Sequence, residues 1–392
     1  MNVFRQIGPA LCGLVALGVA CSSDAGGPNV SPQTLVRVAG DSQGALSGSA
    51  LVVPLTVRVM GSDGQPYKQG VTVTWSVTSG AATLGTPTVT SDTQGLARTT
   101  VTLGATPGAI GVQAAVASIS PVTFAATACD HPLLTLDDTL NVSLATTDCK
   151  FNGFYTDFFE LSVLAGPQGV ILTEMSGVFD TWLELYQRSG SFLGFDDDID
   201  STNQNSRLTA ILATGDYLIA PSSYLTLRTG NYSLAALSRP ASLSACDLVW
   251  VTRGVVVSDS VTPTDCVDST GGLHYADVVA LYLVAGTVLT VSNKSSVFDA
   301  ALFLHSGAGA SVASNNDSAA TTTDAFLAYT VAQTGSYLLF AGTNDSAGTG
   351  AYTLSISASS SLNSAPAEAG PQILRMGGVR MPKALRQRGW RG

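Results

Sequence analysis

Two long stretches of the chain repeat each other, and this internal repeat limits the possible folds more than any other feature. The segment SGVFDTWLELY, beginning at Ser176, matches SSVFDAALFLH, beginning at Ser295. TGDYLIA and TGNYSLAAL in the first stretch match TGSYLLF and TGAYTLSIS in the second, each 120 residues later. A period this long is typical of whole domains in tandem, each with its own core, and not of the short units of a solenoid.

Short alternating runs within each copy predict β-strands. FFELSVLAG, TWLELYQRSG, YLIAPSS and NYSLAAL alternate apolar and polar residues with a period of two, and turn-forming residues bound them. No stretch keeps a helical period of 3.6 residues. Charged residues make up only 12% of the chain, about half the usual share of ~25%. We therefore expect an all-β protein in which each copy is a small antiparallel β-sandwich or jelly roll.

The part of the chain before the repeats predicts a different β-domain. In LVVPLTVRV and GVTVTWSV apolar residues again alternate, and strands recur every 10–15 residues over about 98 positions. This length and rhythm predict an immunoglobulin-like sandwich. We expect Trp75 to fill the space between its two sheets.

These modules resemble two bacterial domain families. On GDSQGALSGSALVVPLTVRV, DGQPYKQGVTVTWSV, SDTQGLARTTVTLG and the closing FAATA, the first module resembles the immunoglobulin-like domain of invasins and intimins. On FD…LELY, the acidic turn FDDDID and the closing G-x-Y…G-x-Y-x-L, the repeats resemble the pre-peptidase C-terminal domain. The second resemblance implies a non-catalytic appendage of secreted enzymes and surface proteins.

The N-terminus predicts export. A basic residue, Arg5, precedes the apolar run ALCGLVALGVAC, which is too short for a membrane span. The run resembles a bacterial lipoprotein signal, which implies that the chain is cleaved before Cys21 and lipidated there. Gly18 departs from the usual leucine of that signal, and an ordinary secretory signal is the alternative. Lipidation would hold the protein at the cell envelope, at the outer membrane or cell surface; without it the protein would be secreted.

The chain thus divides into six predicted segments, of which the last, rich in Ser, Ala and Pro and then basic, is expected to be disordered. They are a signal peptide (1–21), a linker (22–30), the immunoglobulin-like module (31–128), pre-peptidase C-terminal-like copies one (129–238) and two (246–357), and a tail (358–392).

Four cysteines follow the leader in two equally spaced pairs. Cys129 and Cys149 are 20 residues apart, as are Cys246 and Cys266, and the pairs are offset by 117 residues. Exported proteins meet an oxidising compartment, so the spacing predicts two local disulfides. A zinc site is the alternative, although the sequence has no C-x-x-C spacing.

The stretch GDSQG, from Gly40 to Gly44, matches the G-x-S-x-G pattern of serine hydrolases. In those enzymes the serine follows a buried strand and opens a helix. Here the following residues, ALSGSALVV, predict a strand. We therefore expect Ser42 to lie in a turn, and we assign no catalytic residue.

The turn FDDDID places four carboxylates within five positions, at Asp196, Asp197, Asp198 and Asp200. Calcium prefers clustered carboxylate oxygens, so the turn predicts a calcium site; a solvated acidic hairpin is the alternative. An EF-hand is excluded, because Ser201 stands where that loop needs glycine.

Charge and motifs limit the function. The net charge is −10, which argues against a nucleic-acid partner. We expect a non-catalytic surface protein that is held to the membrane by a lipid and presents modules for adhesion to extracellular protein or polysaccharide. An accessory subunit of a secreted peptidase or glycosidase is the first alternative, and an unrecognised hydrolase is the second. The sequence does not indicate an oligomeric state.

Overall fold

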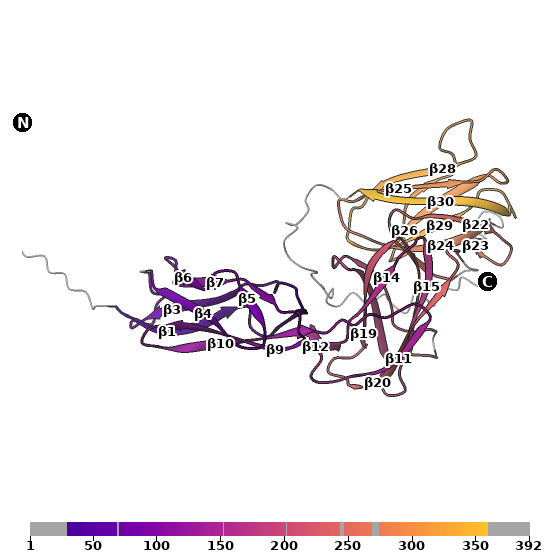
Figure 1. Ribbon diagram of the computed structural model, residues 1–392. Helices are drawn as coiled ribbons and strands as arrows, with labels where there is room; N and C mark the ends of the chain where they lie inside the picture. The colour runs from indigo at the N-terminus through magenta and orange to yellow at the C-terminus, as the bar shows by residue number, and fades with distance from the viewer. Residues whose placement is uncertain are drawn as a thin grey trace, which may run out of the picture.

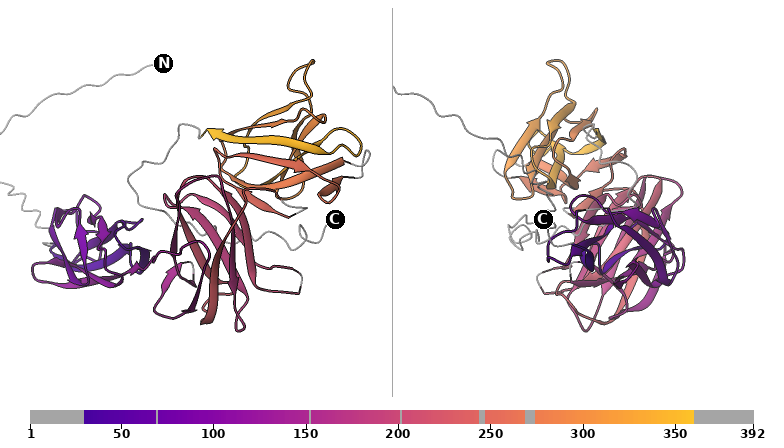
Figure 2. Two further views of the ribbon diagram at one scale, coloured as in Figure 1. Left: turned by 45° about the vertical axis from the view of Figure 1, so that its right-hand side comes forward. Right: turned by 90° about the vertical axis from the view of Figure 1, so that its left-hand side faces the viewer.

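The structure is a computed structural model that describes residues 30–359 except 69, 152, 201, 244–246 and 269–273. Every regular element in this part is a β-strand, as the sequence predicts, and the described residues contain no helix. Figure 1 shows the first module projecting to one side of the two repeats, and Figure 2 shows the second repeat lying against the first.

The first module is a sandwich of two main sheets, in the strand orders β1-β3-β7 and β2-β10-β9-β4-β6, with β5 and β8 as a small third sheet. Trp75 is 2% exposed and packs on Phe124 in the core between the sheets, as predicted. The strands are β1 (Pro32–Ala39), β2 (Gln43–Leu46), β3 (Leu55–Gly61), β4 (Thr72–Ser79), β5 (Ala82–Leu84), β6 (Thr88–Thr90), β7 (Leu96–Thr99), β8 (Val101–Leu103), β9 (Gly108–Val116) and β10 (Ile119–Cys129).

The first repeat has two sheets. Strands β11, β20, β15 and β18 form one side, and β12, β13, β19, β16 and β17 form the other, with β14 also paired to β19. All these pairs are antiparallel. The strands are β11 (Asp138–Leu144), β12 (Cys149–Phe151), β13 (Phe154–Thr156), β14 (Phe159–Val163), β15 (Gln168–Met175), β16 (Thr181–Gln187), β17 (Phe192–Asp196), β18 (Ser206–Leu212), β19 (Gly215–Ser223) and β20 (Gly230–Arg239).

The second repeat uses the same arrangement. Strands β22, β30, β25 and β28 form one sheet, and β24, β29, β26 and β27 lie side by side in the other, with β23 paired to β24. The strands are β21 (Val249–Val251), β22 (Val256–Val261), β23 (Cys266–Asp268), β24 (His274–Leu283), β25 (Val288–Lys294), β26 (Ala300–Ser306), β27 (Ser311–Asn315), β28 (Ala325–Thr330), β29 (Gly335–Thr343) and β30 (Gly350–Ser359).

Strand β21 joins the two repeats into one sheet. It pairs in parallel with β18 of the first repeat and with β24 of the second. A ten-stranded sheet therefore runs through both repeats without interruption. The sequence predicts two separate sandwiches, so this continuity is a difference from the expectation.

The hydrophobic cores of both repeats contain residues of β21. Trp250, 3% exposed, packs in the core of the first repeat, whereas its neighbours Val249 and Val251 pack in the core of the second together with Ile211 from β18. Side chains alternate between the faces of a strand, so one three-residue strand serves both cores. The expectation that each repeat has a core entirely its own is wrong at this joint.

A glycine makes room for the tryptophan. A Cβ atom added to Gly194 of β17 would lie 2.4 Å from the indole ring of Trp250, which is closer than side-chain atoms approach. Phe195 lies 6.0 Å from Trp250, and Phe192 lies 4.8 Å from Tyr282 of β24, measured between ring centroids. We call Phe192, Gly194, Phe195, Trp250 and Tyr282 the aromatic seam.

Candidate functional site

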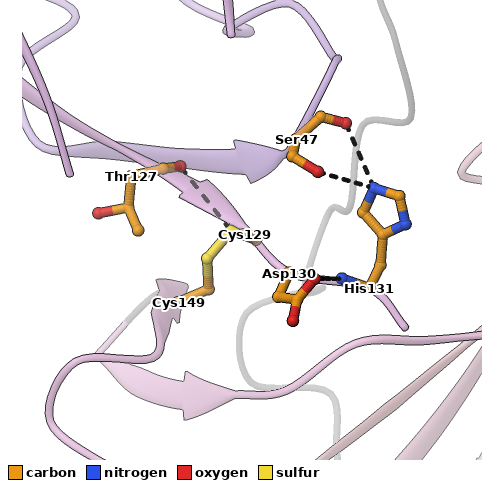
Figure 3. The surroundings of a disulfide bond; sticks show 6 residues. All are labelled: Ser47, Thr127, Cys129, Asp130, His131 and Cys149. Carbon is orange, nitrogen blue, oxygen red and sulfur yellow. Dashed lines mark hydrogen bonds between the residues drawn. A yellow bond between two sulfur atoms is a disulfide. The ribbon is translucent and has the colours of Figure 1, made fainter. Parts of the chain in front are cut away.

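Cys129 and Cys149 form a disulfide that fastens the first module to the first repeat (Figure 3). Cys129 is the last residue of β10 and pairs with Leu46 of β2, so it belongs to a sheet of the first module. The predicted pairing is confirmed, but the bond links two modules and does not close a loop within one repeat. Cys266 is also disulfide-bonded, while Cys246, its predicted partner, lies outside the described residues.

Apolar side chains bury this disulfide. Leu46 of the first module packs with Phe158 and Tyr186 of the first repeat, and each is at most 2% exposed. Burying such side chains contributes about 1.5–3 kcal/mol each. The junction is therefore a small hydrophobic core of its own.

A chain of polar contacts lies beside this core. Oγ of Ser47, in the first module, is 3.1 Å from Nε2 of His131, and Figure 3 shows this contact. Nδ1 of His131 lies 3.1 Å from Oε1 of Glu160, which also accepts a 2.6 Å contact from Nε of Arg188. Hydroxyl, imidazole and carboxylate are ordered as in serine hydrolases.

Backbone geometry argues against catalysis by Ser47. Acyl transfer needs N–H donors aimed at the developing oxyanion. The backbone N–H groups of Ser47, Gly48 and Ser49 all donate to backbone carbonyls at 2.9–3.0 Å. The pair of Ser47 and His131 therefore fastens the modules together. Sequence reasoning missed this pair because its members are 84 residues apart.

We expect the double substitution Cys129→Ala/Cys149→Ala to lower the free energy of unfolding by roughly 3 kcal/mol, the usual effect of opening a loop of this length. Urea unfolding without reductant measures the change. His131→Ala, which removes only the polar contacts, is expected to cost about 1 kcal/mol. A double variant as stable as the unsubstituted protein would contradict a stabilising role for the disulfide.

Ser42 lies in a tight turn, as predicted. The turn joins β1 directly to β2, and Ser42 has the left-handed φ of 59°. Its N–H donates to the carbonyl of Ala125 at 2.8 Å, and Oδ1 of Asp41 accepts from the N–H of Ala125 at 2.9 Å. A strand follows the turn where a nucleophile elbow needs a helix.

The carboxylates of FDDDID order the loop between β17 and β18. Oδ1 of Asp196 accepts from the N–H of Arg207 at 3.1 Å. Oδ1 of Asp200 accepts from the backbone N–H and the hydroxyl of Thr202, at 2.8 and 2.6 Å. Asp196 thus bonds to β18, and Asp200 bonds within the loop itself.

The other two carboxylates of this loop, Asp197 and Asp198, are buried. Among the described residues, no group of three or more His, Cys, Asp or Glu side chains is arranged to hold a metal ion. Calcium binding at this loop stays a prediction. Thermal melting in calcium and in chelator tests it, and identical midpoints would remove the site.

In each repeat an aspartate bonds to a buried tyrosine, and the aspartate is half-buried in the first repeat and buried in the second. The hydroxyl of Tyr232 donates to Oδ2 of Asp157, and the hydroxyl of Tyr352 donates to Oδ2 of Asp277, both at 2.6 Å. The partners occupy equivalent positions 120 residues apart. Burial, partly offset by the tyrosine hydrogen bond, raises the pKa of Asp157 and of Asp277 to about 7.

Asp157 borders a cavity between the first module and the first repeat. The cavity has a volume of about 550 Å³, and Pro107 and Gly108 line it from the first module. Asp130 and Asp148 also line it, and the charges of both further raise the pKa of Asp157. Chemically, the cavity presents hydrogen-bond acceptors next to the interdomain disulfide.

The predicted lipidation site, Cys21, lies outside the described residues, as do residues 360–392 of the predicted tail. Within the part of the chain that is described, no helix has the length and apolar character needed to span a membrane.

Comparison with known proteins gives only weak structural matches. Neither a family model nor a curated protein matches the chain. Among solved structures, it is similar to the D0-D1 domain of intimin (15% identity, TM-score 0.21, 52% of this chain and 96% of that one). It is similar to InvD of Yersinia pseudotuberculosis (14%, 0.21, 83% and 96%) and to a β-glucuronidase of glycoside hydrolase family 2 (10%, 0.21, 50% and 30%). Scores this low carry no argument about function.

Proposed function

We propose that the protein is a non-catalytic surface protein, whose three β-sandwich modules form an array that contacts extracellular protein or polysaccharide. The observation that carries this proposal is that a hydroxyl, an imidazole and a carboxylate, which could act in catalysis, instead connect two modules. Ser47, His131 and Glu160 bridge two modules, and the backbone N–H groups of Ser47 and of the two residues after it are all bonded to backbone carbonyls. β-Sandwich modules that are connected in this way suit a protein that presents a binding surface in a fixed orientation.

Attachment to the envelope through a lipid on Cys21 is part of this proposal, supported by the lipoprotein-like signal in the sequence. Cells expressing the protein are fed an alkyne fatty acid, and the label on the protein is measured. We expect Cys21→Ala to abolish labelling, whereas Cys12→Ala, in the apolar run of the leader, leaves it intact. Equal labelling of both variants would contradict lipidation at Cys21.

The binding role is tested with the purified chain from residue 22 onward on arrays of matrix proteins and of polysaccharides. Saturable binding to either class is the expected result. The same material is screened against ester, peptide and glycoside substrates. Turnover of any of these substrates would contradict the proposal, whether or not Ser47→Ala abolishes that turnover.

An accessory role beside a secreted peptidase or glycosidase is the second candidate, favoured by the resemblance of the repeats to pre-peptidase C-terminal domains. Capture from an envelope extract separates the two functions. Recovery of a hydrolase in stoichiometric amounts, together with no binding on the arrays, would favour the accessory role.

A further inference from the structure

In the first repeat, another strand covers the outer edge of β18. Thr209, Ala210 and Ile211 of β18 pair with β21, which covers this edge. All three residues are buried. The backbone edge of β18 is therefore paired with a short strand, β21, that lies later in the chain.

Strand β28 is the equivalent edge in the second repeat. Leu208 of β18 stands opposite Leu172, and Leu327 of β28 stands opposite Val291, so the strands match with an offset of 119 residues. The same kind of hydrogen bond is made at the start of each of these two edge strands. Oδ1 of Asp196 accepts from the N–H of Arg207, and Oδ1 of Asn315 accepts from the N–H of Phe326.

Beyond this point the two edges differ. Ala328, Tyr329 and Thr330 occupy the positions of the three residues that β21 covers, yet Ala328 and Thr330 are exposed and Tyr329 is half-buried. β28 ends its sheet, and no described strand pairs with its outer side. Phe326, beside them, is 47% exposed. An edge of this kind is a template for strand addition.

The outer face of the second repeat does not suit another whole module. Ser311, Ala313 and Ser314 stand where the first repeat has Phe192, Gly194 and Phe195 of the aromatic seam. Small and polar residues thus replace the ring contacts, and Ala313 carries a methyl group at the position where Gly194 leaves space for Trp250. A single strand needs none of these contacts, so the geometry favours a bare segment over a second copy of the chain.

Chain connectivity identifies that segment. In the first repeat the chain leaves β20 at Arg239, and ten residues later it begins β21 at Val249. In the second repeat it leaves β30 at Ser359, the equivalent position, and continues for 33 residues. The first pair of adjacent large apolar residues there is Ile373 and Leu374. We propose that residues 372–375 add in parallel to the outer edge of β28, as β21 adds to β18.

Hydrogen–deuterium exchange of the full chain tests this docking, read on peptides covering β28 and compared with a chain that ends at Ser359. We expect those amides of Ala328–Thr330 that point away from β25 to exchange at least tenfold faster in the shortened chain. Full-length Ile373→Pro should show the same loss, because proline interrupts strand pairing. The amides of Thr209–Ile211 are the matched control and should stay protected in all three proteins.

Three outcomes would overturn the proposal. Rapid exchange at β28 in the full chain would mean that no segment covers the edge. Protection that survives both the truncation and Ile373→Pro would mean that the tail is not the cover. Protection that depends on protein concentration would assign the edge to a second copy of the chain. The test is independent of the proposed adhesive function, because it reads only the edge of one sheet.

Discussion

The Trp250→Ala variant is expected to lose about 3–5 kcal/mol of unfolding free energy, the usual cost of removing a large buried aromatic side chain. It should also unfold in more steps than the unsubstituted chain. Trp250 packs in the core of the first repeat from a strand that also pairs with the second. Removing its ring therefore weakens the joint along with the core. Differential scanning calorimetry measures both effects as the midpoint and the number of transitions.

Trp75→Ala supplies the matched control. Trp75 is buried to the same degree, at 2% exposed against 3%, but it lies in the first module, away from the joint between the repeats. This variant should lower the transition of the first module and leave the repeats unfolding together. If Trp250→Ala left the two repeats melting as one transition, the shared strand would not be what couples them.

The Asp277→Asn variant is expected to remove a large part of the pH dependence of stability. Asp277 is 1% exposed and bonds to Tyr352; burial first, and then the charges of Asp265 and Asp259, raise its pKa to about 7. In the unfolded chain an aspartate titrates near 4. The folded protein thus keeps a proton that the unfolded chain has released.

The sign follows from this difference. Below about pH 4 the carboxyl is protonated in both states and its contribution to stability is fully present. Stability falls as the pH rises from about 4 to about 7, because the folded state binds more protons in this window, and it stays low above pH 7. Three pKa units correspond to about 4 kcal/mol at most.

Asparagine keeps an acceptor for Tyr352 and carries no charge, so the variant should gain stability relative to the unsubstituted protein between pH 4 and pH 8. Urea unfolding at a series of pH values measures this. Asp138→Asn is the matched control, because the side chain of Asp138 is already exposed to water. Parallel stability curves for Asp277→Asn and the unsubstituted protein would show that Asp277 ionises without cost.

Much of the fold could be predicted from the sequence because the strands are encoded locally. TWLELYQRSG and NYSLAAL form β16 and β20, and the run containing Trp75 forms β4, since alternation depends only on neighbouring residues. The offset of 120 residues between TGNYSLAAL and TGAYTLSIS also marks Tyr232 and Tyr352 as equivalent. Their hydrogen bonds were not predicted, since pairing across 75 residues depends on how the strands fold together.

The joints between modules could not be predicted for a similar reason. Strand β21 has only three residues, and its two partner strands belong to different repeats. The importance of Gly194 depends on the place that Trp250 takes in three dimensions. The cysteine spacing predicts that Cys129 belongs to the first repeat, whereas its strand completes a sheet of the first module. Contacts between modules leave no periodic pattern in the sequence.

Pulsed electron paramagnetic resonance tests most directly whether the three modules are held as one body. Nitroxide labels are introduced as unnatural amino acids at the exposed positions Ser62, Ser189 and Ser318, one in each module. The contacts at both junctions predict a single narrow distance distribution for each pair of labels. Broad distributions between Ser189 and Ser318 would contradict the continuous sheet, and a broad distribution between Ser62 and Ser189 would contradict the disulfide-fastened junction.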